Sequence, residues 1–208
     1  MLPLDTLLTF ATASLLLALA PGPDNIFVLT QSALYGKKAG IMITLGLCTG
    51  LIAHTLSVAL GVAVLFQTSA LAFGVLKMVG AAYLLYLAWQ TFRAQGATIG
   101  QKKQGYTSLK ILYRRGIIMN VTNPKVSIFF LAFLPQFATP NHGSIAYQMI
   151  LLGGVFIIAA LIVFGAITLL ASHLGEWLQR SKQTQKLMNR IAGTVFLVLA
   201  LKLATTQH

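Results

Sequence analysis

The chain has 208 residues, of which 57% are hydrophobic and only 9% are charged, and its mean hydropathy is +0.80. A soluble domain carries about 25% charged residues, so this composition excludes a soluble protein and indicates an integral membrane protein. The net charge of +12 does not indicate nucleic-acid binding, because the basic residues gather in short stretches between apolar runs. The single cysteine, Cys48, excludes an intrachain disulfide and a thiol redox pair.

Six apolar segments predict an all-α membrane protein with six transmembrane helices. A helix needs about 20 apolar residues to cross the hydrocarbon core of a bilayer. The six segments lie at residues 6–34, 39–66, 69–92, 116–137, 145–171 and 189–206. The whole chain, 1–208, is therefore expected to form one transmembrane domain.

The first segment is interrupted by "LALAPGPDNIF", residues 17–27, in which Pro21, Gly22 and Pro23 precede Asp24. Read alone, this stretch resembles the end of a signal peptide, but the residues before it lack the basic start of such a peptide. The apolar run of residues 7–20 reaches about 21 Å at 1.5 Å per residue, which is short of the roughly 30 Å hydrocarbon core. The break is therefore expected inside the first membrane helix.

Lys and Arg residues follow the first, third and fifth segments and are missing from the turns after the second and fourth. The positive-inside rule then predicts that the three basic loops are cytoplasmic and that both termini are external. Three spans in each half also require the two halves to have opposite orientations. The basic residues of these loops are Lys37, Lys38, Arg93, Lys102, Lys103, Lys110, Arg114, Arg115, Arg180, Lys182, Lys186 and Arg190.

The second half repeats the interruption of the first. "NVTNPKVSIFFLAFLPQF", residues 120–137, places Pro124 and Lys125 inside the fourth segment. Paired interruptions at corresponding positions of two halves are typical of secondary transporters with inverted repeats. We therefore expect repeat 1 at about 1–93, a cytoplasmic linker at about 94–115 and repeat 2 at about 116–208, with the first and fourth helices broken.

The breaks predict polar backbone inside the membrane. Proline lacks an N–H group and clashes with the preceding turn, and the freed polar groups are tolerated only where protein or a water-filled cavity supplies partners. Asn123 followed by Pro124 is typical of an N-cap with proline at the first helical position, and Gly22-Pro23 is a weaker version. Each break then opens a half-helix whose positive end favours a carboxylate.

Asp24 is the only acidic residue within the predicted spans, and Lys125 lies at the opposite break. A charge at the centre of a bilayer costs about 2.5–3.5 kcal/mol, so it normally faces the bundle interior and has a partner or a task. One hypothesis is a buried ion pair between the two residues. We favour a second hypothesis for Asp24, in which it binds a substrate ammonium group or a carried proton. For Lys125, pairing with Asp24 and binding of a substrate carboxylate both stay open.

Further polar residues lie close to the breaks. Asn25, Gln31 and Asn120 are candidates either to contact substrate or to satisfy the broken backbone. His54 lies beside a stripe of small residues in the second segment, and we favour a neutral histidine bonded to a neighbouring helix over a proton relay. The stripe, expected to pack closely against another helix or another subunit, consists of Gly46, Gly50, Ala53, Ser57 and Gly61.

The motifs "PGPDNIFVLTQSALYGKKAG", "LKMVGAAYLLYLAWQ" and "NVTNPKVSIFFLAFLPQF" resemble the LysE/RhtB family of bacterial amino-acid exporters, and its homoserine/threonine-exporter branch most. The resemblance extends over essentially the whole chain. It implies a multi-pass inner-membrane protein that exports amino acids or related metabolites with the proton motive force. The positions that match the family motifs are Pro21, Gly22, Pro23, Asn123, Pro124 and Lys125.

Counting acidic residues narrows the substrate. The chain has only three, Asp5, Asp24 and Glu176, so a dibasic amino acid finds no second carboxylate inside the membrane. A neutral amino acid such as threonine, homoserine or leucine therefore fits better than lysine or arginine. The expected partners are this substrate, protons and the lipid bilayer, together with a possible second copy of the chain in a homodimer, and no nucleic acid.

Two other functions stay open, namely export of another small metabolite or cation and a structural role without transport. An enzyme is not expected, because phosphotransferases and metalloproteases need clusters of carboxylates or histidines at metal-ligand spacing. The chain has one acid inside the membrane and four scattered histidines. No cofactor and no metal are therefore expected.

Overall fold

The computed structural model describes residues 2–68, 70–93, 108–180 and 182–205, and every regular element in these ranges is helical. The predicted all-α fold class is confirmed. The elements are α1 (Leu4–Leu19), α2 (Pro23–Tyr35), α3 (Lys37–Thr68), α4 (Ala70–Arg93), α5 (Leu109–Val121), α6 (Pro124–Ile128), the π-helical turn η1 (Phe129–Phe133), the 3-10 turns η2 (Leu134–Phe137) and η3 (Pro140–His142), α7 (Ile145–Arg180) and α8 (Lys182–Thr205).

Four helices are long and apolar enough to cross a membrane, and there are six spans if each of two bent pairs counts as one. The first pair is α1 with α2, bent by 59°, and the second is α5 with the helical stretch Pro124–Phe137, bent by 49°. Both bends lie at the predicted prolines. The first and fourth spans are therefore the broken ones, as expected.

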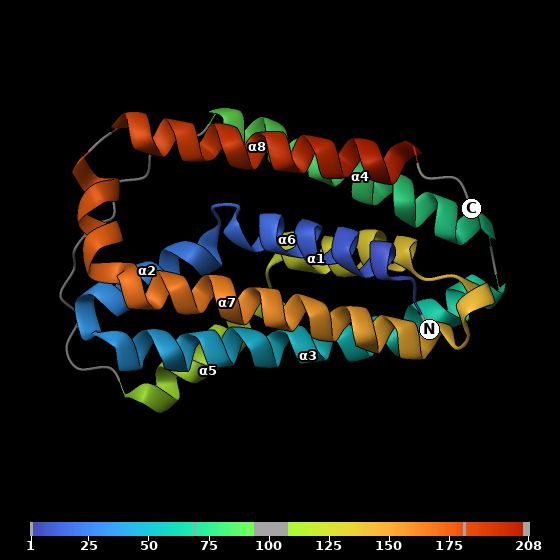
Figure 1. The fold of residues 1–208 in the computed structure, drawn as a ribbon, viewed down its shortest axis with the longest axis horizontal. Coiled ribbons are helices and arrows are strands. Elements are labelled where there is room, and N and C mark those ends of the chain that lie inside the picture. Colours follow the sequence, from blue (N-terminus) through green and yellow to red (C-terminus); the bar gives the residue numbers. More distant parts are fainter. Residues whose placement is uncertain (1, 69, 94–107, 181, 206–208) are drawn as a thin grey trace.

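Parts of both broken spans, α1 and α6, lie between the other helices. Figure 1 shows α1 and α6 between the α4–α8 pair on one side and α3, α5 and α7 on the other, and the packing contacts agree. Phe10 and Leu17 of α1 and Phe129 of η1 are completely buried. This placement keeps the interrupted backbone away from lipid, where its free polar groups would have no partners.

Glycines bring α3 and α5 into backbone contact. A Cβ added at Gly46 would clash with the carbonyl oxygen of Tyr113, and one added at Gly116 would lie 2.6 Å from the carbonyl oxygen of Ile43. A Cβ at Gly50 would lie 2.7 Å from the side-chain oxygen of Asn120, close to the end of α5. Small residues therefore allow the close packing that membrane helices use.

The predicted small-residue stripe packs against α5 only over its first part. Gly46 and Gly50 are buried against α5, whereas Ala53, Ser57 and Gly61 are exposed. The reason is that α5 ends one turn beyond Gly116, beside Gly50, so the rest of the stripe extends past its partner helix.

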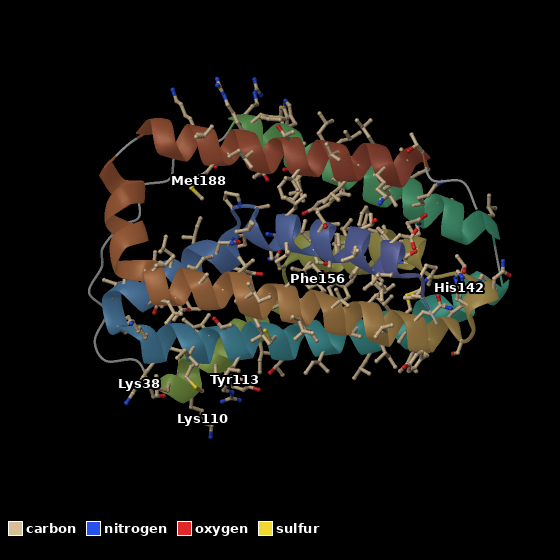
Figure 2. All side chains as sticks on the ribbon, viewed as in Figure 1. Lys38, Lys110, Tyr113, His142, Phe156 and Met188 are labelled. Atoms are coloured by element: carbon tan, nitrogen blue, oxygen red, sulfur yellow. The ribbon has the colours of Figure 1, made fainter. Side chains whose placement is uncertain are left out.

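One end of the bundle carries basic side chains, as Figure 2 shows for Lys38 and Lys110, and His142 lies at the opposite end. Helix α5 begins at Leu109, earlier than the predicted boundary at 116, and its residues Lys110, Arg114 and Arg115 are exposed. The helix extends beyond the apolar segment because backbone hydrogen bonds do not require apolar side chains. The predicted linker falls largely on 94–107, outside the described residues, so the partition into repeats stays a prediction.

Candidate functional site

The carbonyl groups at the C-terminal end of α1 are capped by side chains from outside that helix. The ammonium Nζ of Lys125 donates to the carbonyl oxygens of Leu17 and Ala20, at 3.3 and 3.1 Å. The side-chain amide of Asn25 donates to the carbonyl oxygen of Ala18 at 2.7 Å. Carbonyls at the end of a helix have no partner within it, and a cation there also stabilises the negative end of the helix dipole. Lys125, which lies at the second break, thus forms hydrogen bonds with the backbone of the first break.

Gly22 leaves room for this lysine. A Cβ at position 22 would lie 3.1 Å from Nζ and 3.6 Å from Cε of Lys125. The backbone of Gly22 is extended, with φ −162°, so the position demands space rather than an unusual conformation. The PGP motif therefore ends α1 and, at the same position, leaves space for the side chain of Lys125.

The second break has the predicted cap. Asn123 is the N-cap of α6, its side-chain oxygen accepts from the backbone N–H of Lys125 at 3.0 Å, and Pro124 occupies the first turn. The carbonyl oxygen of Asn120 accepts from the backbone N–H of Asn123 at 3.0 Å and lies 3.2 Å from Nε2 of His54. His54 therefore contacts a neighbouring helix, and its role as a packing residue rather than a proton relay stays a prediction.

The two breaks meet at Asp24, in the first turn of α2. Its side chain is only 2% exposed. The carboxyl group lies beside the side-chain amides of Asn120 and Asn123 and within electrostatic reach of Lys125 and His54. We call Asp24, Asn25, Asn120, Asn123 and Lys125 the break cluster; all five are at most 9% exposed, so the cluster is closed to both sides in this structure.

The break cluster holds most of the unpartnered polar atoms of the described residues. Six buried side-chain atoms of the described residues have no hydrogen-bond partner. Four of the six belong to the break cluster: Oδ1 of Asp24, Asn25 and Asn120, and Nδ2 of Asn123. Buried polar atoms are nearly always hydrogen-bonded in native proteins. Three acceptors and one donor left open around one carboxylate indicate a place for a ligand.

Among the predicted binding residues, Gln31 lies away from the break cluster, whereas His54 contacts its member Asn120. Gln31 follows Asp24 by seven residues on α2, so it lies about 10 Å further along the helix axis. Pro21 and Pro23 flank Gly22 and shape the first break without contributing donors.

Sequence reasoning missed a group of phenylalanines next to the cluster. Ring centroids are 5.9 Å apart for Phe10 and Phe129, 4.8 Å for Phe129 and Phe133, 5.2 Å for Phe133 and Phe137, and 5.1 Å for Phe10 and Phe137. We call these four residues the aromatic barrier. The run "FFLAFLPQF" was the available signal, but it also fits an ordinary apolar helix.

Three of the four barrier residues, Phe129, Phe133 and Phe137, lie on irregular helical backbone. Residues Phe129–Phe133 form a π-helical turn and Leu134–Phe137 a 3-10 turn, and Lys125 lies one turn before the first of them. Phe156 of α7, labelled in Figure 2, packs against Phe129 with ring centroids 5.2 Å apart. Such π-helical turns are rare and occur frequently at functional sites.

Within the described part of the chain, no group of three or more His, Cys, Asp or Glu side chains could hold a metal ion.

A bundle of membrane-length helices, in which two broken spans meet in a buried polar cluster, has the features of a secondary transporter. The chain belongs to the LysE type translocator family, whose sequence model matches residues 15–207. This confirms the resemblance found in the motifs, and it makes the chain a membrane translocator rather than an enzyme.

Relatives match over almost the full length. The chain is 35% identical over 199 residues to a homoserine/homoserine lactone efflux protein of Salmonella typhimurium and to one of Salmonella typhi, with 96% of each chain covered in both cases. It is 30% identical over 208 residues to the uncharacterized membrane protein YrhP of Bacillus subtilis, covering 96% of this chain and 98% of the relative. No solved structure matches the chain.

Proposed function

We propose that this protein exports a neutral amino acid, such as homoserine, threonine or leucine, across the bacterial inner membrane by exchange with protons. The names of the two Salmonella relatives support efflux of a homoserine-like compound. Both termini are then periplasmic and the basic end of the bundle is cytoplasmic. The protein acts alone or as a homodimer.

The observation that carries this proposal is the set of open acceptors in the break cluster. An α-ammonium group has three N–H donors, and Oδ1 of Asp24, Asn25 and Asn120 are three buried oxygens without a partner among the described residues. A buried, charge-assisted hydrogen bond is about twice as strong as a neutral one. The cluster therefore suits an ammonium group better than any other part of a neutral amino acid.

The rest of an amino acid finds donors nearby. Nδ2 of Asn123 has no partner. The ammonium of Lys125 has three N–H donors, and the carbonyls of Leu17 and Ala20 use two of them. Homoserine lactone keeps the ammonium group but has no carboxylate, so recognition of the ammonium group accounts for both compounds in the relatives' name.

Asp24 also supplies a mechanism for proton exchange. A carboxylate that binds an ammonium releases it when it takes up a proton, because the neutral acid no longer attracts the cation. A proton that enters from the periplasm would then expel the substrate outward, and loss of that proton to the cytoplasm would restore the site. One charge moved across 100 mV supplies about 2.3 kcal/mol, enough for a substrate gradient of roughly fifty-fold.

Efflux from vesicles tests the proposal. Proteoliposomes containing the purified protein are loaded with radiolabelled homoserine, threonine, leucine or lysine, and efflux is followed with an imposed proton gradient and after addition of a protonophore. We expect faster efflux of a neutral amino acid that the protonophore slows, and no competition by excess lysine. Efflux equal to that of protein-free vesicles for every amino acid would overturn the proposal.

A further inference from the structure

A second polar site lies at the end of the bundle where α1 begins and α8 ends. A cavity of about 250 Å³ is lined by residues of α1, η1, η2 and α8. At about 30 Å³ per water molecule, the cavity has room for roughly eight waters. This volume is large enough for a small amino acid. Its lining includes Asp5, Thr6, Thr9, Phe133, Phe137 and Lys202.

Opposite charges line this cavity from two helices. Asp5 is one of only three acidic residues in the chain, and Lys202 comes from the last turn of α8. Nζ of Lys202 lies 4.7 Å from the ring centroid of Phe137, which is a cation–π contact with another residue of the cavity lining. A carboxylate and an ammonium across a cavity of this size complement the two charges of a zwitterion.

The cavity lies on the far side of the aromatic barrier from the break cluster. Phe133 and Phe137 belong to both the barrier and the cavity lining, and Phe129 follows Lys125 by one helical turn. Ring contacts from Phe129 to Phe133 and from Phe133 to Phe137 therefore connect the residue one turn after Lys125 to the cavity lining. A ligand that leaves the break cluster past these rings therefore enters the cavity.

We propose that this cavity is a second binding site for a free amino acid in its zwitterionic form, with the ammonium group on Asp5 and the carboxylate on Lys202. The choice of an amino acid as ligand rests on the proposed function. The two sites differ in what they require. The break cluster recognises mainly the ammonium group, whereas the cavity needs both charges and binds an amino-acid ester or lactone weakly. An amino acid held there obstructs release, so high external concentrations slow efflux.

Protection of an introduced cysteine tests the site without transport. Cys48 is the only native cysteine, so Thr9→Cys in a Cys48→Ala background gives one exposed thiol beside the cavity. The labelling rate by a charged methanethiosulfonate reagent is measured on purified protein in detergent, with threonine, threonine methyl ester or the corresponding hydroxy acid added. We expect threonine to slow labelling several-fold and the two analogues to slow it far less.

Charge variants then assign the two contacts. Asp5→Asn or Lys202→Gln should raise the half-protecting threonine concentration about tenfold, as expected for loss of one hydrogen bond to a charged group. Asp5→Glu should keep protection. The controls are Lys186→Gln, at the other end of α8, and Asn141→Cys, an exposed thiol outside the cavity lining that threonine should not protect.

The outcomes separate the two proposals. Protection without amino-acid efflux from vesicles would leave the cavity site standing and contradict the proposed function. Normal efflux without protection of Thr9→Cys would overturn the cavity site. Equal protection by the methyl ester, or unchanged protection in both charge variants, would overturn it as well.

Discussion

Lys125 connects the two halves of the chain through its own backbone and side chain. Its backbone N–H donates to the side-chain oxygen of the N-cap Asn123, while its ammonium donates to the carbonyl oxygens of Leu17 and Ala20 at the end of α1. Lysine in the first turn of a helix opposes the dipole of that helix. The carbonyls at the negative end of α1 offset this cost, an arrangement that requires both breaks at the same depth.

Lys125→Met should destabilise the protein by leaving these two carbonyl oxygens without their donor. Each unsatisfied buried acceptor costs about 1–3 kcal/mol, so the melting temperature in detergent should fall clearly. Lys125→Arg, which keeps the charge and the donors, is the control and should lose less. A Lys125→Met protein that melts like the unchanged protein would contradict the capping role.

Asp24→Asn should abolish proton-driven efflux while the protein still inserts and folds, because the amide has the same shape but neither the charge nor a proton to exchange. Efflux from loaded proteoliposomes and elution as a monodisperse peak measure the two effects separately. Asp24→Glu keeps the chemistry and should retain part of the efflux. Full activity of Asp24→Asn would instead mean that Asp24 only neutralises Lys125.

At the scale of helices, packing depends on how far each partner extends. Gly46 lies where α3 and α5 touch, whereas Gly61 lies on the same helix beyond the end of α5. Both were expected to belong to one packing face. The length of α5, set by the break after Val121, decides which of them is buried.

Gly46→Ala should therefore destabilise the protein, because the new methyl group clashes with the backbone of Tyr113. Overpacking of this kind costs about 1–3 kcal/mol. Gly61→Ala is the matched control: a Cβ there meets nothing within 4 Å, and alanine is a better helix former by about 1 kcal/mol. Thermal melting of the two variants should move in opposite directions, and equal losses would refute the packing argument.

Some of the contacts between helices have counterparts in the other half of the chain. If the two halves exchange under a two-fold rotation, contacts of α1 with α7 correspond to contacts of α5 with α3, and contacts of α2 with α7 correspond to contacts of the α6–η1 stretch with α3. The α3–α7 and α4–α8 pairs map onto themselves. All of these pairs pack together. The inverted-repeat arrangement itself stays a prediction.

At the scale of the whole molecule, the prediction concerns orientation in the membrane. In a Cys48→Ala background, Asn141→Cys should react with a membrane-impermeant maleimide in intact cells, whereas Lys38→Cys and Lys110→Cys should react only after the cells are opened. Figure 2 places Lys38 and Lys110 at the end of the bundle opposite His142, the neighbour of Asn141. The reverse pattern of labelling would place the termini in the cytoplasm.

The candidate site is buried within the molecule. Asp24 and Asn120 are at most 2% exposed, and the aromatic barrier separates them from the cavity beside Asp5. Two members of the barrier, Phe129 and Phe133, lie on the π-helical turn.

The sequence alone determined the membrane class, the helical spans and the two breaks. These features follow from local chemistry: apolar runs of membrane length, prolines that cannot continue a helix, and Asn123 before Pro124 as a cap. The family motifs lie in the same segments, so the translocator class could also be predicted. Asp24 and Lys125 stood out because charges are costly in lipid.

The contacts of these residues follow from how the helices pack in three dimensions. The bonds from Lys125 to Leu17 and Ala20 join positions about one hundred residues apart, and no local pattern encodes such a distance. The same holds for the exposure of Gly61, the exclusion of Gln31 from the break cluster and the meeting of Asp5 with Lys202 in one cavity. Local sequence sets where helices begin and end, whereas the packing of one helix against another sets which side chains share a site.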